Sequence, residues 1–536
     1  MKATYYRMKR GVNKMNRIQK MMFLFFLLFV SLANGAPHAK AETIGNPHKT
    51  ILFVYDSLDV SGSGEKSIES LQRLLTSLNV AVSTVSMDQY QKNQVQEFDG
   101  MIELMNASDL EIQNQAFLAD REDYQGLKLH IGDNLPVSWQ EQMGIQLKKI
   151  PKQRFKLSSQ ELEAKELILE PAEVTVNATD ATTDLGSISF ENQETTYSYG
   201  TLKGKMAYLP YFHATGLSQE LMVKLLQKWL NITYQSQPVL VITGVTPFSD
   251  LALLEYMGDQ LFKEGIPFAV SATSVWQNTD LKAYDKYVDT LQYLQFRNGS
   301  ILLQTPVASQ ANKQDDSELK EIMNTTIDQL VEHEVYPIGI ATPAYWNQDQ
   351  GYQEDALRLS DSVLLLPNPQ TIAKRVVAEK SGVYQKAYYA LPAENLDEIE
   401  WTDTALGYKF SSPTAITYDF PDTLKKLNSM LEKIDNLPMM ARDIRKSEHH
   451  VATSTSVIDV KNGQMRVNGE LKQLHTLPQE SQEKIQKQAT DKGSLADFFA
   501  FQDKVLTIII VGTLFILVVF FIVGYNLYRG KYRTKK

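Results

Sequence analysis

The chain has 536 residues, a formal net charge of −9 and no cysteine. The absence of cysteine excludes disulfides and thiolate metal sites, and the absence of a basic stripe in the central part argues against nucleic acid as a partner. The length is enough for two or three domains, each with its own hydrophobic core.

Residues 1–41 have the pattern of a signal peptide. Basic residues precede the apolar run 21–30, which is shorter than the roughly 20 residues of a spanning helix, and Ala39-Lys40-Ala41 offers a cleavage site. An uncleaved anchor is the alternative, because the basic region is long. An exported protein without disulfides fits a Gram-positive bacterium better than an animal.

Residues 47–145 are predicted to form a small doubly wound, flavodoxin-like α/β domain. Strand patterns at 50–56, 80–85, 98–104 and 127–132 alternate with a helical pattern at 67–78. The loop 59–67 does not match a phosphate-binding loop, since Gly62 and Gly64 are too close together and Glu65 separates Gly64 from Lys66. We interpret it as a turn that caps a helix.

The next segments differ in periodicity. Residues 146–204 have a period of two and predict a β-rich insert. In 205–435, helical period returns at 218–230, and from Pro238 four successive strand–helix units indicate a parallel barrel or a doubly wound sheet, whose catalytic groups lie at the carboxyl ends of the strands. Residues 440–477 contain the Asn-Gly pairs of a β-hairpin segment, and 478–504 read as a polar stalk.

Residues 505–527 are predicted to form a transmembrane helix, because they are uncharged and long enough to cross a bilayer. The uninterrupted apolar length argues against a buried core helix. The tail 528–536 is basic and is expected in the cytoplasm. The chain is therefore expected to be a single-pass cell-membrane protein with extracellular N-terminal domains.

Four blocks in the barrel region resemble the polysaccharide deacetylase superfamily. They read VLVITGVTPFSD (239–250), FKEGIPFAVSATSVW (262–276), NGSILLQTPVAS (298–309) and YPIGIATPAYW (336–346). The resemblance is to the branch of unknown function from bacterial exopolysaccharide gene clusters, and it covers about 238–435. It implies a deformed (β/α) barrel of polysaccharide deacetylase type.

The resemblance also implies where the chemistry of such a barrel would lie. Active members of that branch carry Glu-Asp-Val, His-Gly-Tyr-x-His and Pro-His-Tyr motifs, which supply a general base and the ligands of a divalent metal. In this chain, alignment places neutral residues at all five positions, namely Thr243, Gly244, Gln304, Ala308 and Ala344. Neutral side chains cannot supply such a site, so the barrel is expected to be catalytically silent, without metal or other cofactor.

Other catalytic arrangements find little support. His449 and His450 are adjacent and would point to opposite faces of a strand, and no GxSxG turn is present. Paired carboxylates for glycoside hydrolysis stay open, because spatial pairs are invisible in a sequence. For such a pair, Asp56, Asp59 and Asp250 merit inspection, although each is more commonly a helix cap or a loop residue. His213 and His333 are isolated and are expected to be structural.

Aromatic residues follow the predicted barrel strands. Trp276, Tyr345 and Trp346 are predicted to converge on one rim and stack on sugar rings, with amide contacts from Gln304 or Asn347. The alternative is that these rings only cover the barrel. These five residues are the glycan-binding candidates.

The expected function is a membrane-anchored, extracytoplasmic pseudoenzyme that binds cell-surface or exopolysaccharide glycan, or acts as a scaffold for proteins of exopolysaccharide synthesis. The alternative is an active carbohydrate deacetylase or glycoside hydrolase with displaced active-site residues. A sensor is a third reading, weakened by a tail too short to form a signalling domain.

Overall fold

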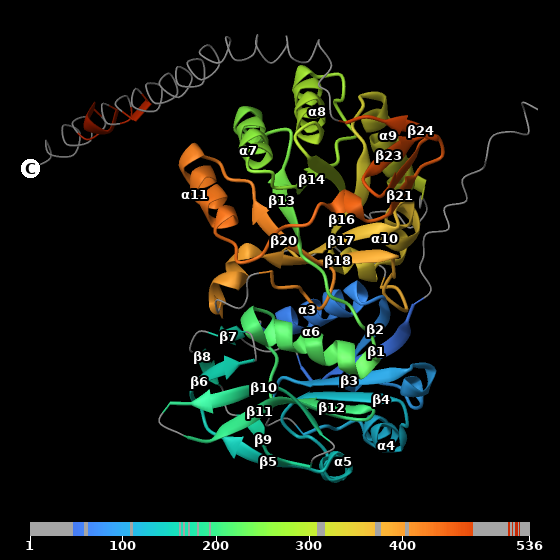
Figure 1. The fold of residues 1–536 in the computed structure, drawn as a ribbon, viewed down its shortest axis with the longest axis vertical. Coiled ribbons are helices and arrows are strands. Elements are labelled where there is room, and N and C mark those ends of the chain that lie inside the picture. The colour runs from blue at the N-terminus through green and yellow to red at the C-terminus, as the bar shows by residue number, and fades with distance from the viewer. Residues whose placement is uncertain are drawn as a thin grey trace, which may run out of the picture. The chain divides into compact units, whose positions relative to one another are not determined.

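The computed structural model (Figure 1) describes residues 47–57, 63–107, 111–159, 162–164, 167–169, 172–179, 182–191, 194–307, 317–369, 377–401 and 407–474, with scattered positions between 513 and 525. The chain divides into two compact units, and the first ends at Gln473. The fold described below is that of the first unit.

The first part of this unit is a parallel α/β sheet. Its strands run in the order β2-β1-β3-β4, an order found in doubly wound sheets. Residues 51–54 of the central strand β1 are apolar and fully buried, so this strand is covered on both faces. The elements are β1 (Lys49–Tyr55), α3 (Ser63–Ser77), β2 (Val80–Ser86), η1 (Met87–Gln89), η2 (Gln94–Glu97), β3 (Gly100–Met105), α4 (Gln115–Asp123), β4 (Leu127–Gly132) and α5 (Val137–Met143).

The β-rich segment continues this sheet and does not form a separate layer. Strand β12 pairs in parallel with β4 and antiparallel with β11, so it joins the two halves. In the described residues the combined sheet has 13 strands. The added strands are β5 (Ile145–Ile150), β6 (Gln153–Ser158), β7 (Leu162–Ala164), β8 (Leu167–Leu169), β9 (Ala172–Ala178), β10 (Thr183–Phe190), β11 (Thr196–Lys203), β12 (Met206–Leu209) and, from much later in the chain, β19 (Ile399–Trp401).

Two elements that were expected in the barrel region, β12 and the helix α6 (Gly216–Leu230), are part of the first half of the unit. Strand β12 is in the sheet, and helix α6 packs on it through β10, β11 and β12. The expected start of the barrel region at 205 is therefore too early, because the first barrel strand begins at Val239. Local periodicity does not show which distant strands pair, so the sequence could not assign β12 to the first sheet.

A closed barrel of seven parallel strands forms the second part, as far as the described residues show, and it confirms the predicted mixed α/β class. The strands are β13 (Val239–Val245), β14 (Phe268–Thr273), β15 (Gly299–Gln304), β16 (Pro337–Pro343), β17 (Ser362–Leu366), β18 (Lys386–Pro392) and β20 (Thr414–Asp419). The helical elements are α7 (Leu251–Lys263), α8 (Lys282–Gln295), α9 (Ser317–Glu332), η3 (Ala344–Gln348), α10 (Gln350–Asp355), η4 (Leu357–Leu359), η5 (Ala393–Glu398) and α11 (Leu424–Asp435).

Helix α3 of the first sheet packs on the barrel beside β18. The guanidinium of Arg73 lies 4.2 Å from the ring centre of Tyr389, and its Nη1 donates to the Ala390 carbonyl at 2.6 Å. The hydroxyls of Ser70 and Tyr389 are 3.0 Å apart. These buried polar contacts tie the sheet and the barrel into one unit.

A four-stranded antiparallel sheet follows the barrel. It comprises β21 (His449–Ala452), β22 (Val457–Lys461), β23 (Gln464–Val467) and β24 (Glu470–Lys472), after the short η7 (Ile444–Lys446). The Asn462-Gly463 and Asn468-Gly469 pairs both have positive φ, as two-residue hairpin turns require. The sheet contacts the barrel through β16.

The predicted signal peptide, stalk and cytoplasmic tail, and most of the predicted transmembrane segment, lie outside the described residues. Within the described part of the chain, no helix is both long and apolar enough to cross a membrane.

Candidate functional site

The carboxyl ends of β13 and β20 bring Thr243 and Asp419 together. The two are partners in the strand register, and the Thr243 hydroxyl donates a hydrogen bond to the Asp419 carboxylate. Thr243 is 8% exposed, whereas Asp419 and the neighbouring Gly244 are exposed. Gly244 has a φ of 72°, a conformation that favours glycine over other residues. Sequence reasoning missed Asp419, although it ends a strand inside the resembling region.

The ends of β14 and β15 present neutral groups. Gln304 is the register partner of Thr273, and both are partly exposed. The hydroxyl of Ser274 donates to the Gln304 carbonyl. This side of the strand-end face can donate and accept hydrogen bonds, but it carries no formal charge at these positions.

The aromatic residues after β16 are buried. Trp346 is fully buried and stacks on Tyr352, with ring centres 3.6 Å apart and planes at 10°. Tyr345 is 3% exposed, and its ring centre lies 4.4 Å from that of Trp346. Ala344, at the position of the third family histidine, is buried at the start of η3. The structure therefore does not bring three rings together on an exposed rim.

The side chain of Asn347 is also buried, and it forms hydrogen bonds within the fold. Its side chain donates to Thr76 of α3 and to the Gly382 carbonyl, each at 3.3 Å, and accepts from the Tyr384 hydroxyl at 2.7 Å. It is 2% exposed. The strand end of β16 is thus covered by α3 and by the segment around Gly382. The Asn347 amide does not face solvent.

The opposite side of the strand-end face is open and apolar. An exposed large hydrophobic residue follows each of four strands that are neighbours in the order β20-β13-β14-β15. We call this set the open arc, and its members are Leu424, Phe248, Trp276 and Val307. Phe248 is 96% exposed and Trp276 is 36% exposed, so Trp276 is the one predicted ring that the structure leaves accessible. Sequence reasoning missed Phe248, whose only signal is its place two residues before the Asp250 helix cap.

The donor set of the strand ends does not fit a catalytic metal. Of the five positions singled out from the sequence, Thr243, Gly244, Gln304 and Ala344 carry no charged side chain, while Ala308 lies outside the described residues. Among the described residues, no group of three or more His, Asp or Glu side chains could hold a metal ion. In the part of the chain that the structure describes, Asp419 is the carboxylate that contacts Thr243, and a single carboxylate does not make the pair of acids that glycosidases use.

The remaining carboxylates have local structural partners. The Asp56 carboxylate accepts from the backbone amides of Ser57, Asn106 and Ala107, which ties the end of β1 to the end of β3. Asp250 caps α7 by accepting from the Leu253 amide at 3.1 Å. Asp59 lies outside the described residues.

The histidines singled out from the sequence also have structural contacts. His449 Nδ1 lies 2.8 Å from the Ser362 hydroxyl, and burial lowers its pKa to about 4. His450 pairs with Asp459 at 2.7 Å. His333 and His213 are exposed. His333 Nδ1 lies 2.9 Å from the Gln329 carbonyl one helical turn earlier, and the His213 ring centre lies 5.4 Å from that of Tyr211. Each of these histidines therefore has a local contact within the fold.

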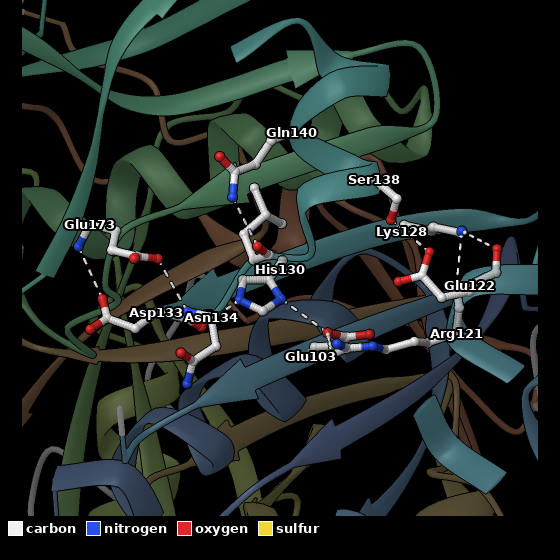
Figure 2. Close-up of polar contacts among 11 residues, drawn as sticks. Glu103, Arg121, Glu122, Lys128, His130, Asp133, Asn134, Ser138, Gln140 and Glu173 are labelled. Carbon is white, nitrogen blue, oxygen red and sulfur yellow. Dashed lines mark hydrogen bonds and ion pairs between the residues drawn. The ribbon is translucent and has the colours of Figure 1, made fainter. Parts of the chain in front are cut away.

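A second polar cluster, which sequence reasoning missed, lies inside the first sheet (Figure 2). It centres on Glu103 of β3 and His130 of β4, both fully buried, with Arg121 and Asp133 beside them. Glu103 and His130 lie in strands of mostly apolar residues, and the register of β3 against β4 makes these two residues partners. No local sequence signal gives that register.

Comparisons with known proteins add little. No protein-family model matches the chain, and no curated protein matches it. One solved structure similar to this chain is a glutamine amidotransferase from Thermotoga maritima. It is 11% identical, the match covers 35% of this chain and 85% of that chain, and the TM-score is 0.20. A TM-score this low supports no statement about a shared fold.

Proposed function

We propose that the chain is a non-catalytic glycan-binding or scaffold protein of exopolysaccharide production, built on a barrel of polysaccharide deacetylase type. The observation that carries the proposal is the open arc beside a neutral set of strand ends. Exposed Phe248 and Trp276 provide apolar ring faces, while Thr243, Gln304 and Asp419 provide polar groups next to them.

This combination suits a sugar polymer better than a purely apolar partner. Aromatic rings stack on the apolar faces of pyranose rings, and neighbouring polar groups bond the hydroxyls at the ring edges. Each contact is weak, so affinity would come from several sugar units along one chain and from many copies in one membrane. The proposal of binding without deacetylation is supported by the neutral side chains of Thr243, Gln304 and Ala344.

We propose that the protein is anchored by its C-terminal segment with the barrel outside the cell. The support is the uncharged run 505–527 followed by a basic tail. Protease added to intact protoplasts should then remove nearly all of the chain and leave a small C-terminal fragment. Protection of the barrel would contradict this orientation.

The test of glycan binding is a pull-down of the full-length chain with the producer's own exopolysaccharide. The double variant Phe248→Ala, Trp276→Ala should lose most of the retention. Tyr256→Ala is the matched control, because Tyr256 is a similarly exposed ring, at 40%, on α7 outside the open arc. Circular dichroism should confirm that all variants fold.

Three outcomes separate the alternatives. Loss of retention in the double variant but not in the control supports the proposal. Equal retention in both would show that the open arc is not the binding surface. Absence of retention in the wild type would favour a scaffold that binds protein partners of exopolysaccharide synthesis.

A further inference from the structure

The imidazole of His130 and the carboxyl of Glu103 face each other in the core of the first sheet (Figure 2). The two residues are register partners on adjacent strands, and His130 Nδ1 lies 2.9 Å from Glu103 Oε2. The rings of Trp139 and Tyr208 flank the imidazole, with ring centres 6.3 Å and 6.0 Å away. Both members of the pair are 0% exposed, so water cannot compensate for a missing hydrogen bond.

A count of hydrogens shows that this pair needs one proton more than a neutral histidine and a carboxylate provide. His130 Nε2 lies 2.8 Å from the Asp133 carbonyl oxygen, which can only accept, so Nε2 must carry a hydrogen. A neutral imidazole has a single N–H. Its Nδ1 would then present a lone pair to the Glu103 carboxylate, and the contact would be repulsive.

The surrounding charges decide where the extra proton lies. Arg121 of α4 points Nη1 at the same Glu103 oxygen from 3.4 Å, which favours the ionised carboxylate. The ammonium of Lys128 in β4 bonds the carbonyls of Arg121 and Glu122 and lies 4.7 Å from the Trp139 ring centre. The Asp133 carboxylate lies 3.7 Å from Lys149. The hydroxyl of Tyr208, from β12, bonds the Glu173 carbonyl.

We infer that His130 is held as an imidazolium and that Glu103 and His130 form a proton-dependent clasp in the first sheet. The charged pair satisfies both ring nitrogens at once. Loss of the proton would leave the Glu103 carboxylate facing a lone pair in a buried site, with its other oxygen already without a partner.

The position of the clasp gives it a structural consequence. Strand β4 is flanked by the parallel strand β3 on one side and by β12, which leads into the β-rich half, on the other. His130 also fixes the loop after β4, where the Asp133 carboxylate accepts from the Glu173 amide of β9 at 3.0 Å. Deprotonation would loosen the seam between the two halves of the sheet.

The test uses Glu103→Gln in the full-length chain. A glutamine amide can donate to Nδ1 of a neutral His130, so the variant needs no extra proton. Above about pH 6.5, where an unfolded histidine is neutral, the folding equilibrium constant of the wild type should fall up to about tenfold per pH unit relative to the variant. Urea denaturation at several pH values between 6 and 9 measures this difference, and parallel pH profiles would overturn the inference.

A second measurement stands even if Glu103→Gln fails to fold. The wild-type chain with ¹⁵N-labelled histidine is observed at pH 8, and His130→Gln identifies the resonance by its absence. The expected spectrum shows hydrogens on both ring nitrogens of His130. A single N–H, characteristic of a neutral tautomer, would contradict the clasp.

Discussion

Carboxylates and aromatic rings occur both in the first sheet and near the strand ends of the barrel, yet the two regions use them differently. In the first sheet, Glu103 and His130 are fully buried and bond each other. At the open arc, Phe248, Trp276 and Asp419 face solvent. A residue type therefore does not indicate function until its burial and partners are known.

The largest expected difference between a buried and an exposed residue comes from making the same substitution at two tryptophans of the barrel. Trp346→Ala removes a fully buried ring that stacks on Tyr352 and should cost about 3–5 kcal/mol of folding free energy. Trp276→Ala, at a partly exposed ring of the open arc, should cost about 1 kcal/mol. Urea denaturation measures both values, and equal losses would show that the burial difference is wrong.

The buried carboxyl of Glu220 tests whether burial also controls the behaviour of a single ionisable group. Burial raises its pKa to about 7, and its Oε2 accepts from the Tyr408 hydroxyl at 2.9 Å. The folded state thus favours the protonated form. The associated stability is present below the unfolded value near 4.5 and is lost as the pH rises to about 7.

Glu220→Gln keeps an acceptor for Tyr408 and removes this titration. The variant should therefore be more stable than the wild type at pH 8, by at most about 3 kcal/mol, and should show no gain at pH 4. Thermal denaturation at the two pH values checks the prediction. A gain of the same size at both would mean that ionisation is not the cause.

His449 should give a pH dependence of the opposite sign. Burial lowers its pKa from 6.5 to about 4, so the folded state favours the neutral ring that contacts Ser362. Stability is complete above about pH 6.5 and should fall by at most about 3 kcal/mol as the pH drops to about 4. His449→Gln should remove this slope, whereas His333→Gln, directly after the end of α9, should leave it unchanged.

The sequence was sufficient for the first four strand–helix units of the barrel, because their strands and helices carry their own apolar period, but it did not predict β18, β20 or α11. It was not sufficient for β12, whose partner β4 is far away in the chain, nor for the pairing of Glu103 with His130. The neutral character of Thr243, Gly244 and Gln304 was readable directly. The burial of Tyr345, Trp346 and Asn347 was not, since it depends on α3 and on the segment around Gly382 covering the end of β16.

The central claim is that the barrel binds glycan and does not cut or deacetylate it. The most direct measurement incubates the full-length chain with an acetylated amino-sugar polymer, with and without added zinc, cobalt, nickel or manganese, and records polymer retention, acetate release and bound metal together. We expect retention that depends on Phe248 and Trp276, acetate release equal to buffer, and substoichiometric metal. Acetate release that requires a stoichiometric metal would contradict the account.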